Sequence, residues 1–324
     1  MKTIYKTFYL LLMKSSILVG GQAVIEGVMM RVPGAYATSV RLANGEIETE
    51  RHAFCSIIEK YKLEKIYFLR GMIHLYESMK MGYATLDWSA QLHEEKTEQK
   101  KNKLLDLLMT IFSIFFALSL FVLLPLYSTS YFFNDTINYP LSFNLISGFI
   151  RVFIFLSYLI LISRLKDVKT LFEYHGAEHK TVYNFESGEK INIGNARTYS
   201  TLHPRCGTSF VFILMLVTIF TYTIIDSIAL LFIDELTYIY RMGFHILCIP
   251  LVSGIGYEVL KFLAKYQKNI FCRTLSKPGM WLQKITTNEP NDKQLEIAIH
   301  ALKTALGKDF QKYQGKKFVA DAIG

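Results

Sequence analysis

Two histidines flank a glutamate in the segment His175-Gly176-Ala177-Glu178-His179. Side chains four residues apart share one face of a helix, so both imidazoles can bind the same metal ion. The string matches H-x-x-E-H, the inverted form of the zincin motif, in which the glutamate acts as general base toward metal-activated water. Glu178 is therefore the candidate catalytic residue. The alternative is a helix that carries two hydrogen-bonded histidines, because strings this short also arise by chance.

A second group of ligand-type residues, His203 and Cys206, lies in the segment 203–207. Imidazole and thiolate together suit Zn²⁺. The sequence thus predicts zinc or another divalent metal, bound by His175, His179, His203 and Cys206. Four protein ligands would make a closed structural site, and three would leave a position open for catalysis. The sequence leaves both open, as well as a Pro-Gly turn in which Cys206 is only packed.

The apolar residues, 51% of the 324, are gathered into long runs. A hydrocarbon core about 30 Å thick needs roughly 20 apolar residues of helix. The runs predict four transmembrane helices, near residues 104–127, 141–163, 208–232 and 242–264. The expected fold is a mainly α membrane protein with four transmembrane helices, a small cytoplasmic N-terminal α/β region and a cytoplasmic metal-site loop.

Lysine and arginine are distributed unevenly between the predicted loops. Seven lie within 164–206, and none lies within 128–140. Because basic loops stay on the cytoplasmic side, both termini and the long middle loop are predicted to be cytoplasmic. The net charge of +9 suits a bilayer surface, and no basic stripe with interleaved aromatics indicates a nucleic-acid partner.

Three regions follow from these runs: a cytoplasmic α/β region over 1–103, a transmembrane region over 104–264 with its cytoplasmic loop 164–207, and a cytoplasmic helical tail over 265–324. Alternating patterns and an Asn44-Gly45 turn signal predict strands over 24–30, 36–41 and 46–53. Helical patterns cover 56–88 and, after Pro290, 291–306.

Several charged residues are candidates for a pocket beside the metal site. Ionisable groups inside a membrane are costly and mark function by default. Arg151 and Glu258 fall within predicted spans and are expected to form an ion pair, and the alternative is that Glu258 supplies a carboxylate ligand to the metal. Asp226 and His245 lie near outer ends, where side chains can snorkel. The further candidates, from the glycine-rich string 20–31 and the middle loop, are Glu26, Arg31 and Arg205. The simpler interpretation of that string is a strand between tight turns.

The chain resembles the YqhQ-like family of bacterial and plastid membrane proteins in the strings GGQAVIEGVMMR, EYHGAEHKTVYNFESGE, ARTYSTLHPRCGTSF, GIGYE and TTNEPNDKQLEIAIHALKTAL. The resemblance runs from about Gly20 to Leu306. It implies a membrane protein of unknown function, described at most as a predicted metal-dependent enzyme. The family pattern covers His175, Glu178, His179, His203, Arg205, Cys206, Glu258, Glu26 and Arg31.

Three functions compete at this point. The first is a metal-dependent hydrolase that acts on a lipid, a peptide or a membrane-protein segment at the cytoplasmic interface. The second is a non-catalytic membrane assembly or insertion factor with a structural metal. The third is a small transporter that uses Arg151, Asp226 and Glu258, which is least favoured because the chain contains no internal repeat. The oligomeric state stays open.

Overall fold

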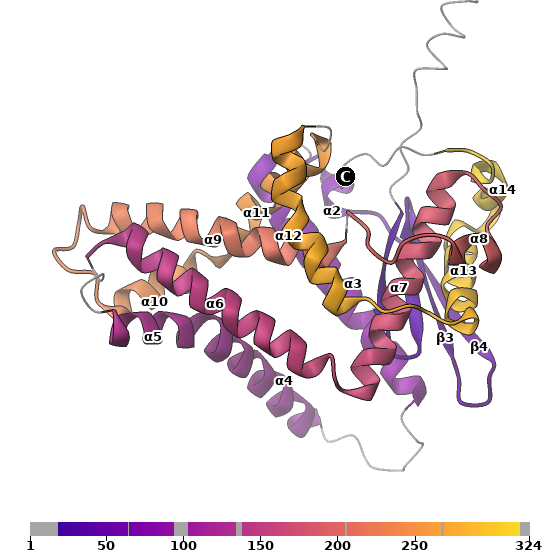
Figure 1. Ribbon diagram of the computed structural model, residues 1–324, viewed down its shortest axis with the longest axis horizontal. Coiled ribbons are helices and arrows are strands. Elements are labelled where there is room, and N and C mark those ends of the chain that lie inside the picture. The colour runs from indigo at the N-terminus through magenta and orange to yellow at the C-terminus, as the bar shows by residue number, and fades with distance from the viewer. Residues whose placement is uncertain are drawn as a thin grey trace, which may run out of the picture.

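The computed structural model describes residues 19–63, 65–93, 103–133, 138–204, 206–266 and 269–317. The molecule is elongated, with apolar helices at one end and a unit of sheet and helices at the other (Figure 1). Arg205, one of the predicted pocket residues, lies outside the described residues.

Four antiparallel strands form a meander in the N-terminal part. They follow in the spatial order β1 (Gly20–Val24), β2 (Gly27–Val32), β3 (Ala35–Arg41) and β4 (Ile47–Ala53). The prediction of one strand over 24–30 is wrong, because the chain turns at Ile25 and Glu26, where the φ of Glu26 is 49°. The turn between β3 and β4 contains Gly45 at a φ of 90°, as the Asn-Gly pair predicts.

One face of the sheet is covered by α7 (Lys166–Ser187) and α13 (Asp292–Leu306), which come from far along the chain (Figure 1). Their apolar side chains share one core with the strands, including Met30, Tyr174 and Leu302. The short α8 (Ile193–Arg197) contacts both helices. The strands therefore share their core with segments from beyond residue 103.

Three helical stretches are long and apolar enough to cross a membrane, and a bent pair of helices adds a fourth if it counts as one span. The first stretch, Leu107–Phe132, runs through α4 (Lys103–Leu118), a π-helical turn (Ser119–Leu123) and α5 (Leu124–Phe132). The others are α6 (Pro140–Ile162) and α9 (Gly207–Ala229). The protein is thus mainly helical, with three to four candidate spans.

The bent pair consists of α10 (Tyr238–Leu247) and α11 (Ile249–Lys265), which meet at 56°. The run predicted over 242–264 is therefore not one straight helix. Pro250 stands in the first turn of α11. Proline has no N–H to continue the ladder of α10, and its ring collides with a carbonyl one turn earlier.

The ionisable side chains of α9 and α10 that were candidates for snorkelling are instead enclosed by the protein. Asp226, Arg241 and His245 are fully buried. The Asp226 carboxylate lies 3.0 Å from Arg241 Nε and 2.9 Å from His245 Nε2, and it accepts a 2.7 Å hydrogen bond from Asn144 of α6. A buried carboxylate needs such partners because solvent cannot stabilise it, so this group connects three helices.

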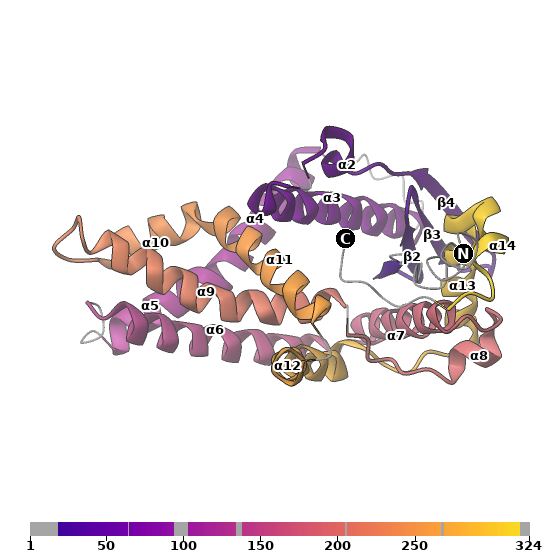
Figure 2. The ribbon, with the colours of Figure 1, turned by 90° about the horizontal axis from the view of Figure 1, so that it is seen from above.

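Helix α3 (Tyr67–His93), preceded by the short α2 (Ile57–Tyr61), packs along α11. At the contact, Gly71 faces Gly254, so the two backbones approach closely. This amphipathic helix connects the N-terminal sheet to the last candidate span (Figure 2).

The expected ion pair between Arg151 and Glu258 is not formed. Glu258 binds Arg70 of α3 through both carboxylate oxygens, at 2.7 and 2.6 Å. Arg151 instead donates to the Phe121 carbonyl and to Thr218 Oγ1. The reason is position, since α3 brings a guanidinium to Glu258 from outside the bundle.

The first helix of the predicted helical tail, α12 (Ile270–Thr286), packs along α9; the sequence patterns did not give its bounds. The chain then passes into α13, whose capping box uses Asn291 and Gln294. The described chain continues through a 3-10 turn (Gly307–Asp309) and α14 (Phe310–Tyr313).

The contact between α3 and α11 can be tested at Gly71. A Cβ there would lie 3.0 Å from the Gly254 carbonyl oxygen and 3.0 Å from Tyr257 Cβ. We expect Gly71→Leu to lower the free energy of unfolding in detergent by about 1–3 kcal/mol, the usual effect of overpacking. The matched control is Gly243→Leu, since Gly243 is also helical but has open space around its Cβ position. Equal thermal stability of the two variants would contradict this contact.

Candidate metal centre

Helix α7 carries the H-x-x-E-H residues and is buried on most sides. It ends at Gly188, which adopts a left-handed φ of 75°. Near its middle, a Cβ at Gly176 would overlap the carbonyl oxygen of Asn288, because the segment after α12 crosses the helix there. The backbone N–H of Asn288 also donates a hydrogen bond to the Phe172 carbonyl at 2.9 Å. The small residue inside the motif therefore allows the tail to cross at the site.

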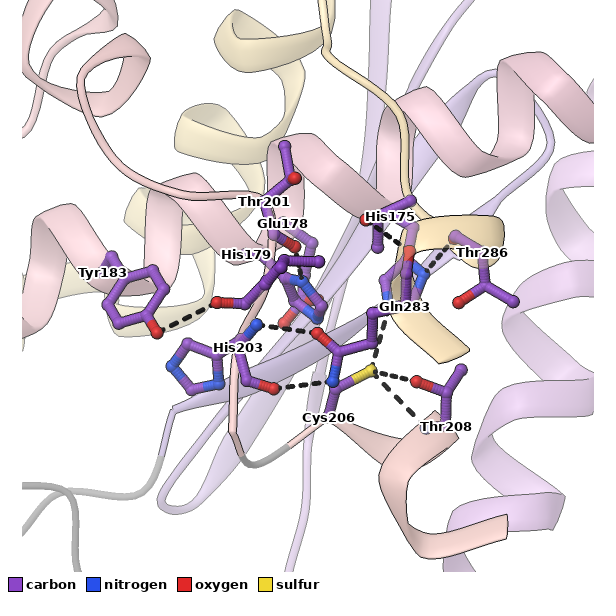
Figure 3. Close-up of polar contacts among 12 residues, drawn as sticks. His175, Glu178, His179, Tyr183, Thr201, His203, Cys206, Thr208, Gln283 and Thr286 are labelled. Carbon is purple, nitrogen blue, oxygen red and sulfur yellow. Dashed lines mark hydrogen bonds and ion pairs between the residues drawn. The ribbon is translucent and has the colours of Figure 1, made fainter. Parts of the chain in front are cut away.

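Both histidines of α7 are held by backbone carbonyls, as Figure 3 shows. His175 Nδ1 lies 2.8 Å from the Thr286 carbonyl oxygen, and His179 Nδ1 contacts the Thr201 carbonyl oxygen. A carbonyl can only accept, so each Nδ1 carries the proton and each Nε2 keeps its lone pair. Metal-binding histidines are commonly held in this way by a second hydrogen bond.

The two Nε2 atoms and Cys206 Sγ converge. His175 Nε2 lies 3.1 Å from Cys206 Sγ, and the ligand atoms of His175, His179 and Cys206 all lie within 4.8 Å of one another. His179 Nε2 is buried and makes no hydrogen bond within the described part of the chain. Such an orphaned nitrogen, beside a sulfur and a second imidazole, fits a zinc ion.

The protonation state of His179 agrees with a ligand role. Burial lowers the pKa of His179 below its usual value. The ring is therefore neutral at physiological pH, which is the form that binds a metal.

Cys206 is placed by the start of a span. It is the N-cap residue of α9, and its sulfur accepts from the backbone N–H of Thr208 at 3.5 Å. The sulfur also lies 3.2 Å from Thr208 Oγ1. The start of α9 thus fixes the position of this sulfur, and a thiolate sulfur is a usual ligand of zinc.

Glu178 lies beside these ligands. Its carboxylate is buried, and Oε2 is 3.4 Å from His179 Nε2. Strand β1 passes close by, since a Cβ at Gly21 would lie 2.8 Å from Glu178 Cγ. The absence of a side chain at Gly21 thus allows the glycine-rich segment 20–31 to pack against the H-x-x-E-H segment of α7.

The structure does not bring His203 into the group of three. Its backbone N–H donates to Gln283 Oε1 at 2.7 Å, and its carbonyl accepts from Gln283 Nε2 at 2.8 Å (Figure 3). Its ring packs against Tyr183, with Nε2 3.6 Å from Glu186. Burial lowers the pKa of His203 to about 4. The ring of His203, the predicted fourth ligand, therefore lies outside the group of three, and its centroid is 5.6 Å from that of the His179 ring.

A cavity of about 670 Å³ opens onto the group of three and Glu178. Arg31, one of the candidate pocket residues, lines it together with Gln22 and His74. Glu26 does not line it, because it stands at the turn after β1, where it accepts from Tyr174 Oη. The remaining candidates, Arg151 and Glu258, lie among the spans with the partners given above and do not line it either.

Two residues of this site were missed by sequence reasoning. Gln283 of α12 hydrogen-bonds to the backbone of His203, and His74 of α3 lines the cavity. Neither stands in a motif, and both reach the site only through packing of distant helices.

Comparison with known proteins adds a family. A family model described as "Protein of unknown function (DUF1385)" matches residues 66–308. The chain belongs to this family. The matched part includes α7, Cys206 and the spans, and it begins after the sheet. The match confirms the prediction that the chain belongs to a family of unknown function. The description of the family assigns no reaction to the residues of the site.

The chain is also similar to the "Uncharacterized protein YqhQ" of Bacillus subtilis (strain 168). The identity is 30% over 323 residues, covering 92% of this chain and 95% of that protein. This similarity, unlike the family match, extends over nearly the whole chain. No solved structure matches the chain.

The three-residue geometry predicts which substitutions remove the metal. We expect purified protein to contain about one zinc per chain, and His179→Ala and Cys206→Ser to lose it, because each removes one of three ligands. His203→Ala should keep the metal, since its imidazole stands outside the group. Elemental analysis by mass spectrometry measures this. Metal loss in His203→Ala would establish a closed four-ligand site, and metal-free wild type with unchanged stability in chelator would refute the site.

Proposed function

We propose that the protein is a zinc-dependent hydrolase whose site faces the cytoplasm at the surface of the bacterial inner membrane. The observation that carries this proposal is the arrangement of His175, His179 and Cys206 at the wall of a cavity, with the Glu178 carboxylate beside them. Three protein ligands that leave one side open are typical of catalytic zinc, whereas structural zinc is enclosed by four.

The chain's own residues divide the work of hydrolysis. Bound zinc would supply Lewis acidity, which polarises a carbonyl and lowers the pKa of water. Glu178 would take a proton from the attacking water and return it to the leaving group. The carbonyls of Thr201 and Thr286 hold the two imidazoles in one tautomer throughout. The cavity wall is more apolar than polar, and an apolar surrounding strengthens electrostatic interactions.

A second function has one observation in its favour. The ligands come from two elements, α7 and the N-cap of α9, so an ion between them would connect the cytoplasmic unit to a span. That arrangement suits a membrane assembly factor in which the metal is structural. The carboxylate of Glu178 favours the hydrolase, because a structural ion has no use for a base at the cavity wall.

Glu178→Gln separates the two functions. It keeps the shape of the side chain and removes the base, so hydrolysis of p-nitrophenyl acetate by the zinc-loaded protein should fall about 10²–10⁴-fold with zinc retained. Glu173→Gln is the matched control: it lies on the same helix, it can still accept from Gln294, and it does not line the cavity. Equal activity of both variants, beside a destabilised His179→Ala, would leave only the structural role.

The orientation in the membrane is tested by cysteine labelling. We expect a membrane-impermeant maleimide to label Tyr139→Cys in intact spheroplasts and to label Lys190→Cys only after lysis, because lysine and arginine concentrate in 164–206. Both positions are exposed, so access to each depends on the side of the membrane. Labelling of Lys190→Cys in intact cells would place the site outside and refute the cytoplasmic assignment.

A further inference from the structure

The strand β1 has a free edge at the metal-site cavity. It is the first strand in the order β1-β2-β3-β4, so within the part of the chain that the structure describes it pairs with a strand, β2, on one side only. Five consecutive residues, Val19 to Ala23, line the cavity. The cavity wall is therefore partly the backbone of an edge strand, which can template another strand.

The register identifies which backbone groups face outward. The Arg41 amide donates to the Glu26 carbonyl, so the even-numbered residues of β2 exchange hydrogen bonds with β3. The odd-numbered residues of β2 then pair with Gly20, Gln22 and Val24 of β1. The N–H and C=O groups of Gly21 and Ala23 consequently point away from the sheet.

A neighbouring contact agrees with this register. The amide of Ile25, the next outward-facing residue, donates to Ser89 Oγ of α3 at 3.2 Å. Among the described residues, the outward groups of Gly21 and Ala23 have no such partner. Two residues spaced i and i+2, each offering one donor and one acceptor, are what an added antiparallel strand requires.

The free edge lies next to the catalytic carboxylate. Gly21 brings β1 against Glu178 of α7, and on the other side Gln22 Nε2 donates to the Gly82 carbonyl of α3 at 3.2 Å. Figure 2 shows α3 and α7 running on two sides, with the strands at one end of the space between them. A strand added to β1 would thus pass between these helices, directly alongside Glu178.

We infer that the substrate is an extended stretch of polypeptide, which binds as an added strand on β1 through Gly21 and Ala23. This rests on the proposed hydrolase function. One water is consumed: its oxygen bonds to the peptide carbonyl carbon, the C–N bond breaks, and Glu178 carries the proton from water to the leaving amine. A lipid is the competing substrate, because Arg31 and the apolar lining suit it. A lipid tail, however, has no groups to pair with the open edge.

The test uses the full-length zinc-loaded protein in detergent with a quenched-fluorescent library of apolar decapeptides. Ala23→Pro removes an outward N–H that the sheet does not use, and edge positions tolerate proline. Ala53→Pro is the matched control, because the Phe54 amide bonds to the Gly34 carbonyl and so Ala53 faces outward on the opposite edge. We expect peptide cleavage, with kcat/KM about tenfold lower in Ala23→Pro than in Ala53→Pro.

A second measurement does not depend on the folding of a variant. Peptides N-methylated at alternate amides should compete for the wild-type protein about tenfold more weakly than unmethylated ones, because they cannot donate to β1. Three results would overturn the peptide assignment. The first is equal competition by methylated and unmethylated peptides, and the second is equal cleavage rates in the two proline variants with equal zinc content. The third is cleavage of phosphatidylglycerol in mixed micelles without peptide cleavage. Failure of the hydrolase itself would look different: p-nitrophenyl acetate hydrolysis would be absent or insensitive to Glu178→Gln.

Discussion

The hydrogen bonds from the Nδ1 atoms of His175 and His179 to two backbone carbonyls connect three distant parts of the chain at one point. One carbonyl belongs to Thr286, at the end of α12, and the other to Thr201, in the segment that leads into α9. Because each carbonyl fixes a tautomer, the lone pairs turn toward Cys206. These two hydrogen bonds also require close packing around α7, because the end of α12 and the segment after it must lie against that helix for the Thr286 carbonyl to reach His175. A larger residue than glycine at the crossing would separate them.

The helices that are long and apolar enough to span a membrane obey a different constraint. Without water, a charged group inside the bundle must find its partners within the protein. Asp226 does so with Arg241, His245 and Asn144, and in this way one carboxylate joins α6, α9 and α10. The break between α10 and α11 at Cys248 is consistent with these contacts. The bend lets α10 carry Arg241 and His245 to Asp226, while α11 packs along α3. The ionisable side chains of these candidate spans are thus accounted for by helix packing, and they lie apart from the group of His175, His179 and Cys206.

Close backbone approach is what turns a small sheet into part of the site. Gly21 permits β1 to touch α7, because a Cβ there would meet Glu178 Cγ at 2.8 Å. Exposed strand edges are normally blocked by charge, proline or a covering helix, because they invite pairing with other chains. Here α3 covers the edge at Ile25 and then leaves it open where it meets the cavity. Access for a partner strand is therefore limited to the side of the proposed base.

The sequence alone determined the features that depend on near neighbours. Apolar runs marked the spans, the four-residue spacing put His175 and His179 on one helical face, and capping residues located the start of α13. These signals act within a few residues, so they can be read without knowing the fold. Only the tertiary structure decided which partner each polar group takes: Glu258 bonds to Arg70, 188 residues away, and Cys206 joins the histidines while His203 turns toward Tyr183. These partners depend on where helices cross. The crossing points are set by packing between segments that are distant in sequence, and sequence periodicity does not report such contacts.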